Sequence, residues 1–263
     1  MAGTGMGAKA AKATYVYCAV QALRKPSVGR APSGPPGLGT HRLLDAGQGL
    51  WLVVADAPPA RFGEASIQRG LHDLKWLSRC AVAHEAVVEH FVRASAVIPM
   101  KLFTIFESDT RALAEIARQR RQLDRSIHHV TGGREWGVRI RAVPEPVAVR
   151  PARPPRKIET GASYLAAKKQ ARDTTRERAE RGRVRVERAF TTLVALSVDV
   201  RRHPPPPGGA QSTRLLLDAA FLVRNPVAAR FRTATRQLAR DLRGDGYGVE
   251  VTGPWPPYNF IES

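Results

Sequence analysis

The stretch Glu135–Ala142, with the sequence EWGVRIRA, decides the fold of the second half of the chain. Apolar and charged residues alternate along it, so that Trp136, Val138 and Ile140 fall on one face of an extended chain. Side chains of a β-strand point alternately to its two faces, and strict alternation is typical of a strand that is buried on one face only. We therefore expect a strand whose apolar face lies on a core.

The residues after this strand predict five further elements. The first three are a long helix from Gly161 to Ala195, a possible short strand at Leu196–Arg201 and a dense apolar strand at Arg214–Val223. An amphipathic helix, begun by Asn-Pro, runs from Asn225 to Leu242, and a last alternating strand is Tyr247–Thr252. Strand, helix, strand, strand, helix, strand is the order of a ferredoxin-like domain. We expect such a domain, with a long helix and an open antiparallel sheet.

The first half predicts a second α+β unit. It begins with a strand at Thr14–Val20 and a hairpin around Gly47-Gln48, formed by His41–Ala46 and Gly49–Ala55. A helix at Leu71–Phe91 and a strand-like segment with an internal proline at Val97–Phe106 follow. The last element is an arginine-rich helix at Asp109–Val130, which Ser108 or Asp109 caps. The fold class is thus α+β with two domains.

We divide the chain into a flexible tail at residues 1–13, an N-terminal α+β domain at 14–130 and a C-terminal ferredoxin-like domain at 131–263. The second domain then includes a Pro/Arg-rich loop at 143–158 and the closing GPWPPY sequence. A boundary inside the Pro/Arg-rich loop is the alternative. It would separate the strand Glu135–Ala142 from the elements that this strand completes.

The formal net charge of +19 is the strongest feature of the composition. It indicates an anionic partner, an acidic protein surface or a coding bias towards arginine, and it favours non-specific nucleic-acid affinity in each case. The longest apolar runs, such as Leu215–Val223, are too short to span a bilayer, and the N-terminus has no apolar core of a secretory signal. We expect no membrane association and a cytoplasmic location.

No catalytic, metal or cofactor motif stands out. The sequence has no HxxxH, HExxH, CxxC or GxSxG, and its glycine-rich start lacks the GK[ST] of a phosphate-binding loop. Cys18 and Cys80 lie in apolar runs and are expected to be buried thiols. His84 lies on an apolar helix stripe and is expected to be a partly buried histidine with satisfied hydrogen bonds rather than a ligand or base. We predict no enzyme activity and no cofactor.

Four segments carry a resemblance to a known family. They are Tyr15-Val16-Tyr17; His84-Glu85-Ala86-Val87-Val88 with Ile98-Pro99-Met100-Lys101 and Thr104-Ile105-Phe106; Glu135-Trp136-Gly137-Val138 with Gly161-Ala162-Ser163-Tyr164-Leu165; and the rare ending Thr252–Phe260, TGPWPPYNF. On these segments the chain resembles the gas vesicle protein L/F family (GvpL/GvpF) from end to end. It departs from the family pattern where Lys101-Leu102-Phe103 replaces the usual Arg-Phe-Gly, and where Asn259 replaces the usual Ser.

The resemblance implies a minor component of gas vesicles, the gas-filled, protein-walled buoyancy organelles of some prokaryotes. Such a protein would bind the small, very hydrophobic major shell protein, and other minor gas vesicle proteins, and limit aggregation of the shell protein during nucleation. It would act at the gas vesicle, in the cytoplasm, without catalysis. The alternative from charge alone is a basic nucleic-acid-binding module, although no stacking aromatic residue interrupts the basic stretch Lys168–Arg188.

The closing sequence supplies the candidate partner-binding residues. Prolines fix an extended backbone and aromatic side chains offer large apolar area, so this segment either packs back on its own domain or presents an apolar surface to a shell subunit. The candidates are Trp255, Pro256, Pro257, Tyr258 and Phe260. Trp136 is expected in the core, and the basic stretch Lys168–Arg188 is either a solvated helix face or a docking face for acidic partners.

Overall fold

The computed structural model describes residues 13–143, 161–204 and 215–261. They form two units. The first contains the described residues up to Gly133 together with those from Trp255 onward, and the second is Arg134–Pro254. The expected tail at 1–13, apart from Ala13, and the expected Pro/Arg-rich loop at 143–158, apart from Val143, lie outside the described residues.

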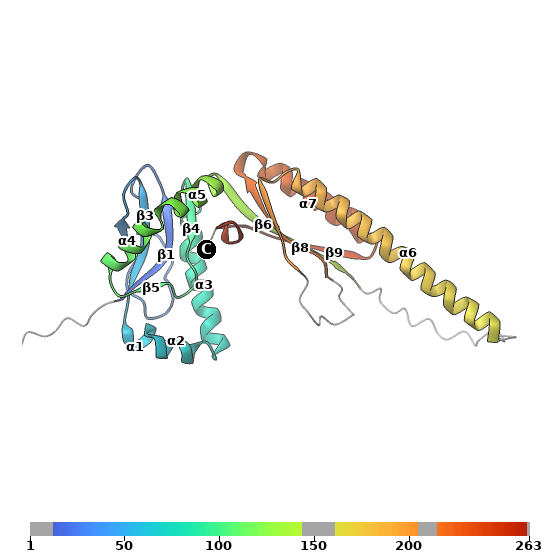
Figure 1. Ribbon diagram of the computed structural model, residues 1–263, viewed down its shortest axis with the longest axis horizontal. Coiled ribbons are helices and arrows are strands. Elements are labelled where there is room, and N and C mark those ends of the chain that lie inside the picture. The colour runs from blue at the N-terminus through green and yellow to red at the C-terminus, as the bar shows by residue number, and fades with distance from the viewer. Residues whose placement is uncertain (1–12, 144–160, 205–214, 262–263) are drawn as a thin grey trace, which may run out of the picture. The chain divides into compact units, whose positions relative to one another are not determined.

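The sheet of the first unit has β1 at its centre (Figure 1). Its antiparallel order is β2-β3-β1-β4, and β5 also pairs with β1. Gly47, Gln48 and Gly49 have positive φ in the turn between β2 and β3, which confirms the predicted hairpin. The strands are β1 (Ala13–Gln21), β2 (Arg42–Asp45), β3 (Leu50–Ala57), β4 (Ala96–Pro99) and β5 (Ile105–Phe106).

Helices cover both faces of this sheet. On one face Val87 and Phe91 of α3 pack against Tyr15 and Tyr17 of β1. On the other face Thr14 Oγ1 donates a hydrogen bond to Asp109 of α4, as the alternation of β1 requires. The helices are α1 (Pro59–Phe62), α2 (Glu64–Gly70), α3 (Leu74–His90), α4 (Asp109–Arg118) and α5 (Arg120–Val130).

Two single elements predicted from the first half are each divided in the structure. The strand expected at Val97–Phe106 is β4 and β5, because Pro99 has no N–H for a continued ladder and Phe103 takes a positive φ of 65° in the turn that follows. The helix expected after Ser108 is α4 and α5, with a break at Gln119. Ser108 is the N-cap, since its side chain accepts from Arg111 N.

The second unit is the expected ferredoxin-like domain. Its strand order, β7-β8-β6-β9, places the third strand of the unit beside the first, with the second and fourth at the edges. Trp136, Val138 and Ile140 of β6 are buried in its core, as their alternation predicts. The elements are β6 (Gly133–Ala142), α6 (Gly161–Val194), β7 (Asp199–Arg202), β8 (Leu215–Arg224), the 3₁₀ turn η1 (Asn225–Val227), α7 (Ala228–Arg243) and β9 (Tyr247–Trp255).

Both sheets follow one strand order. β2-β3-β1-β4 in the first unit matches β7-β8-β6-β9 in the second when the four main strands of each unit are numbered along the chain. The second unit connects its first two strands through α6, whereas no helix lies between β1 and β2 in the first. The Pro/Gly-rich segment between them, Arg24–Thr40, accounts for this difference, since prolines and glycines disfavour a helix.

The closing sequence differs from the predicted domain division. The sequence analysis assigns it to the C-terminal domain, whereas the residues from Trp255 onward belong to the first unit. The 3₁₀ turn η2 (Tyr258–Phe260) lies on the first unit because Phe260 is buried there and the Tyr258 hydroxyl bonds to Glu85 of α3. A sequence reading that follows chain order cannot anticipate this return.

Candidate functional site

The last part of the closing sequence, Trp255–Phe260, combines buried anchors with half-exposed aromatic rings, and we call it the closing segment. Pro256 and Pro257 are buried, and Phe260 is only 3% exposed. Trp255 and Tyr258 remain 39% and 38% exposed. The two alternatives drawn from the sequence therefore describe different residues of the same segment. Prolines and Phe260 hold the segment in place, whereas Trp255 and Tyr258 offer apolar surface to solvent.

Tyr258 connects this segment to α3. Its hydroxyl donates a hydrogen bond to the carboxylate of Glu85. Burial raises the pKa of Tyr258, and the neighbouring Glu85 raises it further. The phenol is consequently protonated at neutral pH and remains a hydrogen-bond donor.

An apolar cavity of about 410 Å³ opens beside this segment, inside the first unit. One wall is the chain around β4 and β5, the opposite wall is α4 and α5, and Tyr258 and Ile261 close one side. The apolar lining includes Val16, Ile98, Pro99, Met100, Ile116 and Leu123. The polar part of the lining comes from Lys101, Thr104, Glu115, Gln119, Gln122 and Ser126. A concave apolar site with few polar groups is the usual form of a binding cavity.

One polar atom in the cavity wall has no partner. Ser126 of α5 is 4% exposed, lines the cavity, and its Oγ is among the buried side-chain atoms of the described residues that make no hydrogen bond. A buried hydroxyl without a partner is unfavourable by about 1–3 kcal/mol. A bound group that offers a donor or acceptor at this point would remove that cost.

A buried histidine supports the cavity wall from behind. His84 of α3 is 3% exposed, and its Nδ1 lies 2.7 Å from Tyr15 Oη, while Nε2 lies 3.1 Å from the Met100 carbonyl oxygen. The carbonyl can only accept, so Nε2 carries the proton and Nδ1 accepts from the tyrosine hydroxyl. Desolvation lowers the pKa of His84 to about 4. The expectation that the hydrogen bonds of His84 are satisfied is confirmed, and the ring is more deeply buried than the sequence predicted.

The loop after β4, whose Met100 carbonyl oxygen bonds to His84, continues into the cavity wall. The Phe103 N–H lies 3.4 Å from Tyr15 Oη, and the Phe103 ring stacks on Trp76 with centroids 5.3 Å apart. Phe103 also has the positive φ that glycine adopts most readily. The ring stacking is a local contact that a glycine could not make.

Segments far apart in sequence thus meet at this place. Tyr15, His84, Met100 and Tyr258 come from three of the four segments on which the resemblance rests, and bonds connect the first three directly. The remaining segment belongs to the second unit, where Trp136 is buried and packs on Phe231 with ring centroids 5.8 Å apart. The cavity and Ser126 carry no signal of their own in the sequence, whereas the apolar stripe of α3 indicated the place of His84.

Within the ranges that the structure describes, no group of three or more His, Cys, Asp or Glu residues could hold a metal ion. Cys18 and Cys80 are free and buried. None of the described helices is both long and apolar enough to cross a membrane.

Comparison with known proteins supports the family. Residues 13–262 match the family described as gas vesicle synthesis protein GvpL/GvpF. The chain belongs to the GvpL/GvpF family. It is therefore a gas vesicle-related protein, and the family description is one of gas vesicle synthesis rather than of catalysis.

Two curated GvpL/GvpF relatives agree. Gas vesicle protein L of Streptomyces sp. is 30% identical over 259 residues, which cover 94% of this chain and 91% of the relative. Gas vesicle protein F2 of Halobacterium salinarum is 25% identical over 178 residues, covering 68% of this chain and 64% of the relative.

Solved structures of GvpF share the fold. The crystal structure of GvpF from Anabaena sp. aligns with a TM-score of 0.65 at 14% identity, covering 96% of this chain and 97% of that one. GvpF from Microcystis aeruginosa aligns with a TM-score of 0.64 at 14% identity, covering 95% of this chain and 99% of that one. At this identity the likeness shows a shared fold, which agrees with the two-domain α+β architecture.

Proposed function

We propose that this protein is an assembly factor and minor component of gas vesicles, which binds the major shell protein and limits its aggregation during nucleation. Other minor gas vesicle proteins are further partners under the same proposal. The binding surface is the apolar cavity of the first unit together with the exposed parts of Trp255 and Tyr258. Pro256, Pro257 and Phe260 hold this surface in shape.

The observation that carries the proposal is the apolar cavity beside the closing segment. Its lining would exchange water for an apolar side chain of a partner, which favours binding by about 25 cal/mol per Å² of apolar surface removed from water. Loss of translational and rotational freedom offsets part of that gain. The fixed position of the closing segment limits the further ordering cost, because its prolines and Phe260 are already buried.

Coverage of apolar surface is sufficient for the proposed role. A very hydrophobic subunit aggregates through the same surface that it buries in the assembled wall. A protein that occupies this surface reversibly would keep the subunit in solution and release it to a growing vesicle. No covalent step is required.

Binding of the major shell protein in a pull-down tests the proposal. Deletion of the closing segment is a poor variant, because it removes the buried Phe260 along with the exposed rings. Single substitutions Trp255→Ser and Tyr258→Ser remove only partly exposed rings. Leu74→Ser is the matched control, since Leu74 is 77% exposed in α3 of the same unit.

We expect each aromatic substitution to weaken binding about tenfold, as loss of an interface anchor does, and Leu74→Ser to bind like the parent protein. Tyr258→Phe separates the ring from the hydroxyl: it keeps the apolar surface and loses only the bond to Glu85. Circular dichroism and thermal unfolding establish that each variant is folded. Equal binding by the parent, both serine variants and the control would contradict the proposed surface.

A further inference from the structure

The long helix of the second unit extends beyond the sheet that it packs on. With 34 residues α6 is about 51 Å long, whereas the longest strands of this sheet have 10 residues and span about 33 Å. Figure 1 shows one end of α6 extending past the strands of this sheet. Every described residue of α6 from Leu165 to Arg181 is exposed, and burial begins at Gly182. We call residues 165–181 the free half of α6. Its length exceeds what the core of its own unit can cover.

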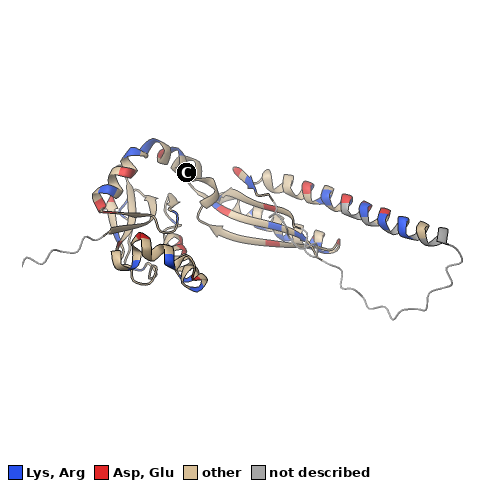
Figure 2. Ribbon diagram, turned by 60° about the horizontal axis from the view of Figure 1, so that its bottom comes forward, with Lys and Arg blue, Asp and Glu red and all other residues tan. Residues whose placement is uncertain are grey.

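The free half, together with the residues of α6 that follow it up to Arg188, is strongly basic. Residues 168–188 contain nine Lys or Arg and four Asp or Glu, a net charge of +5 (Figure 2). A helix that is polar on all sides gains little from burial against an apolar surface. Two copies would repel each other along this helix. A partner of opposite charge fits it best.

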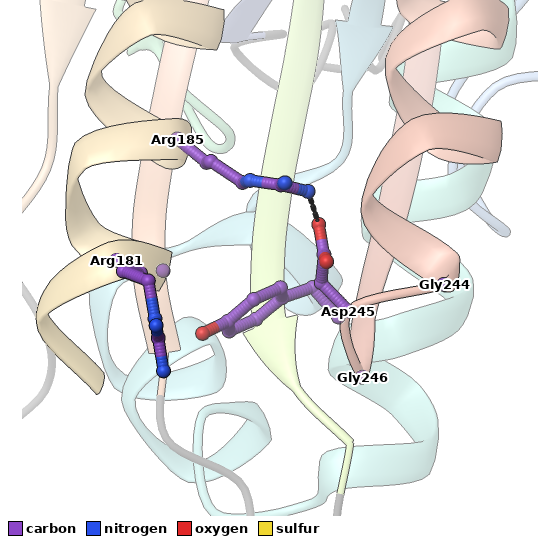
Figure 3. Close-up of a pocket in the computed structure, with 7 residues that line it drawn as sticks. Arg181, Arg185, Gly244, Asp245 and Gly246 are labelled. Carbon is purple, nitrogen blue, oxygen red and sulfur yellow. Dashed lines mark hydrogen bonds and ion pairs between the residues drawn. The ribbon is translucent and has the colours of Figure 1, made fainter. Parts of the chain in front are cut away.

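A cavity lies where the free half meets the sheet. It has a volume of about 370 Å³ and is lined by Arg181, Gly182, Arg185, Gly244, Asp245, Gly246 and Tyr247 (Figure 3). Gly182 makes room for the Tyr247 ring, because a Cβ built at this position would clash with Tyr247 Oη. The ring can lie against α6 in this orientation only because this position has no side chain.

The two arginines of the cavity differ in their partners. Arg185 reaches across to Asp245 and forms an ion pair with it (Figure 3). Arg181 runs in another direction, and no hydrogen bond or ion pair engages its guanidinium within the described residues. The cavity thus offers one guanidinium with a full positive charge and unused donors. A guanidinium binds a carboxylate through two parallel N–H···O bonds.

We propose that the second unit binds an acidic protein segment along the free half of α6, with one carboxylate of that segment against Arg181 in the cavity. This surface is separate from the apolar surface proposed above and serves a different partner or a different part of the same partner.

Two features favour a protein over a nucleic acid. Four acidic residues interrupt the basic stretch and would meet a continuous phosphate backbone with repulsion, and no aromatic residue between 165 and 189 offers a base a stacking surface.

Fluorescence anisotropy with the full chain tests this inference. The probes are a labelled Glu-rich helical peptide, the same peptide with Gln in place of every Glu, and a labelled DNA duplex, all at about 0.15 M salt. The variants are Arg181→Gln and the matched Arg172→Gln. Both residues are exposed on α6 and both variants lose one positive charge, but only Arg181 lines the cavity.

We expect the Glu peptide to bind, the Gln peptide to bind at least tenfold more weakly, and Arg181→Gln to lower affinity about fivefold more than Arg172→Gln. Equal losses in the two variants would reduce the site to general charge attraction and overturn the inference. Equal binding of the Gln peptide would do so as well. Tighter binding of the duplex than of the Glu peptide would assign the surface to nucleic acid instead.

Discussion

Acid is expected to destabilise the first unit through one buried histidine. His84 is neutral in the folded protein, where its pKa is about 4, and it returns to its ordinary value of 6.5 in the unfolded chain. Between these values the unfolded chain binds more protons than the folded protein, so the free energy of unfolding falls as the pH falls. Above pH 6.5 the contribution of neutral His84 is fully present, and below pH 4 it is fully lost.

The size of this effect follows from the two pKa values. A difference of one in pKa corresponds to about 1.4 kcal/mol, so the whole drop is about 3 kcal/mol, most of which is lost by pH 4.5. The structural cause is burial, because a charged imidazolium loses its hydration in a site that is 3% exposed. Protonated Nδ1 can also no longer accept the hydrogen bond from Tyr15 Oη. This loss is a large fraction of the stability of an ordinary domain.

Urea denaturation of the parent protein and of His84→Gln at several pH values measures it. Gln can still donate to the Met100 carbonyl oxygen but does not titrate, so the other histidines cancel in the difference between the two proteins. We expect the stability advantage of the parent to shrink by about 2–3 kcal/mol between pH 8 and pH 4.5. A difference that stays constant over this range would refute the reasoning about His84.

Three further predictions concern single positions. Phe103→Gly will be more stable than Phe103→Ala by about 1 kcal/mol in chemical denaturation, since both lack the ring and only Ala is strained at a φ of 65°; equal stability would remove the strain argument. Gly182→Ala will lower the melting temperature of the second unit despite the better helix propensity of Ala, and will raise it once Tyr247→Ser has removed the clashing ring; destabilisation in both backgrounds would point to another cause. Ser126→Ala will leave the free protein equally stable or up to about 1 kcal/mol more stable, because it removes a buried hydroxyl without a hydrogen bond. The same substitution will weaken binding to the shell protein in the pull-down. Unchanged binding would exclude Ser126 from the interface.

The sequence predicted the architecture well where periodicity and turn residues agree. The alternation of Glu135–Ala142 gave the buried face of β6, and Gly47 marked the hairpin of β2 and β3. The two divided elements show where this reasoning ends. Nothing in the apolar pattern of Val97–Phe106 reveals that the chain leaves the sheet after Pro99 and rejoins it at Ile105, because both halves retain a strand-like composition.

The candidate site was predictable only in part. The aromatic and proline content of the closing sequence singled out Trp255, Pro256, Pro257, Tyr258 and Phe260 without separating the exposed rings from the buried residues. The return of this segment to the first unit depends on a contact between Tyr258 and Glu85, 173 positions apart. The cavity depends on the separation between α4–α5 and the chain around β4 and β5, which no local pattern encodes. Ser126 reads as an ordinary helix residue until its burial is known.

The most direct test of the central claim is the soluble fraction of the major shell protein when it is co-expressed with this chain. We expect the parent protein and Leu74→Ser to raise this fraction, and the combined Trp255→Ser and Tyr258→Ser variant, folded and expressed to the same level, to raise it much less. If the parent protein leaves the soluble fraction unchanged, the proposed assembly role is contradicted. If the combined variant acts as well as the parent, the role remains but the proposed surface is wrong.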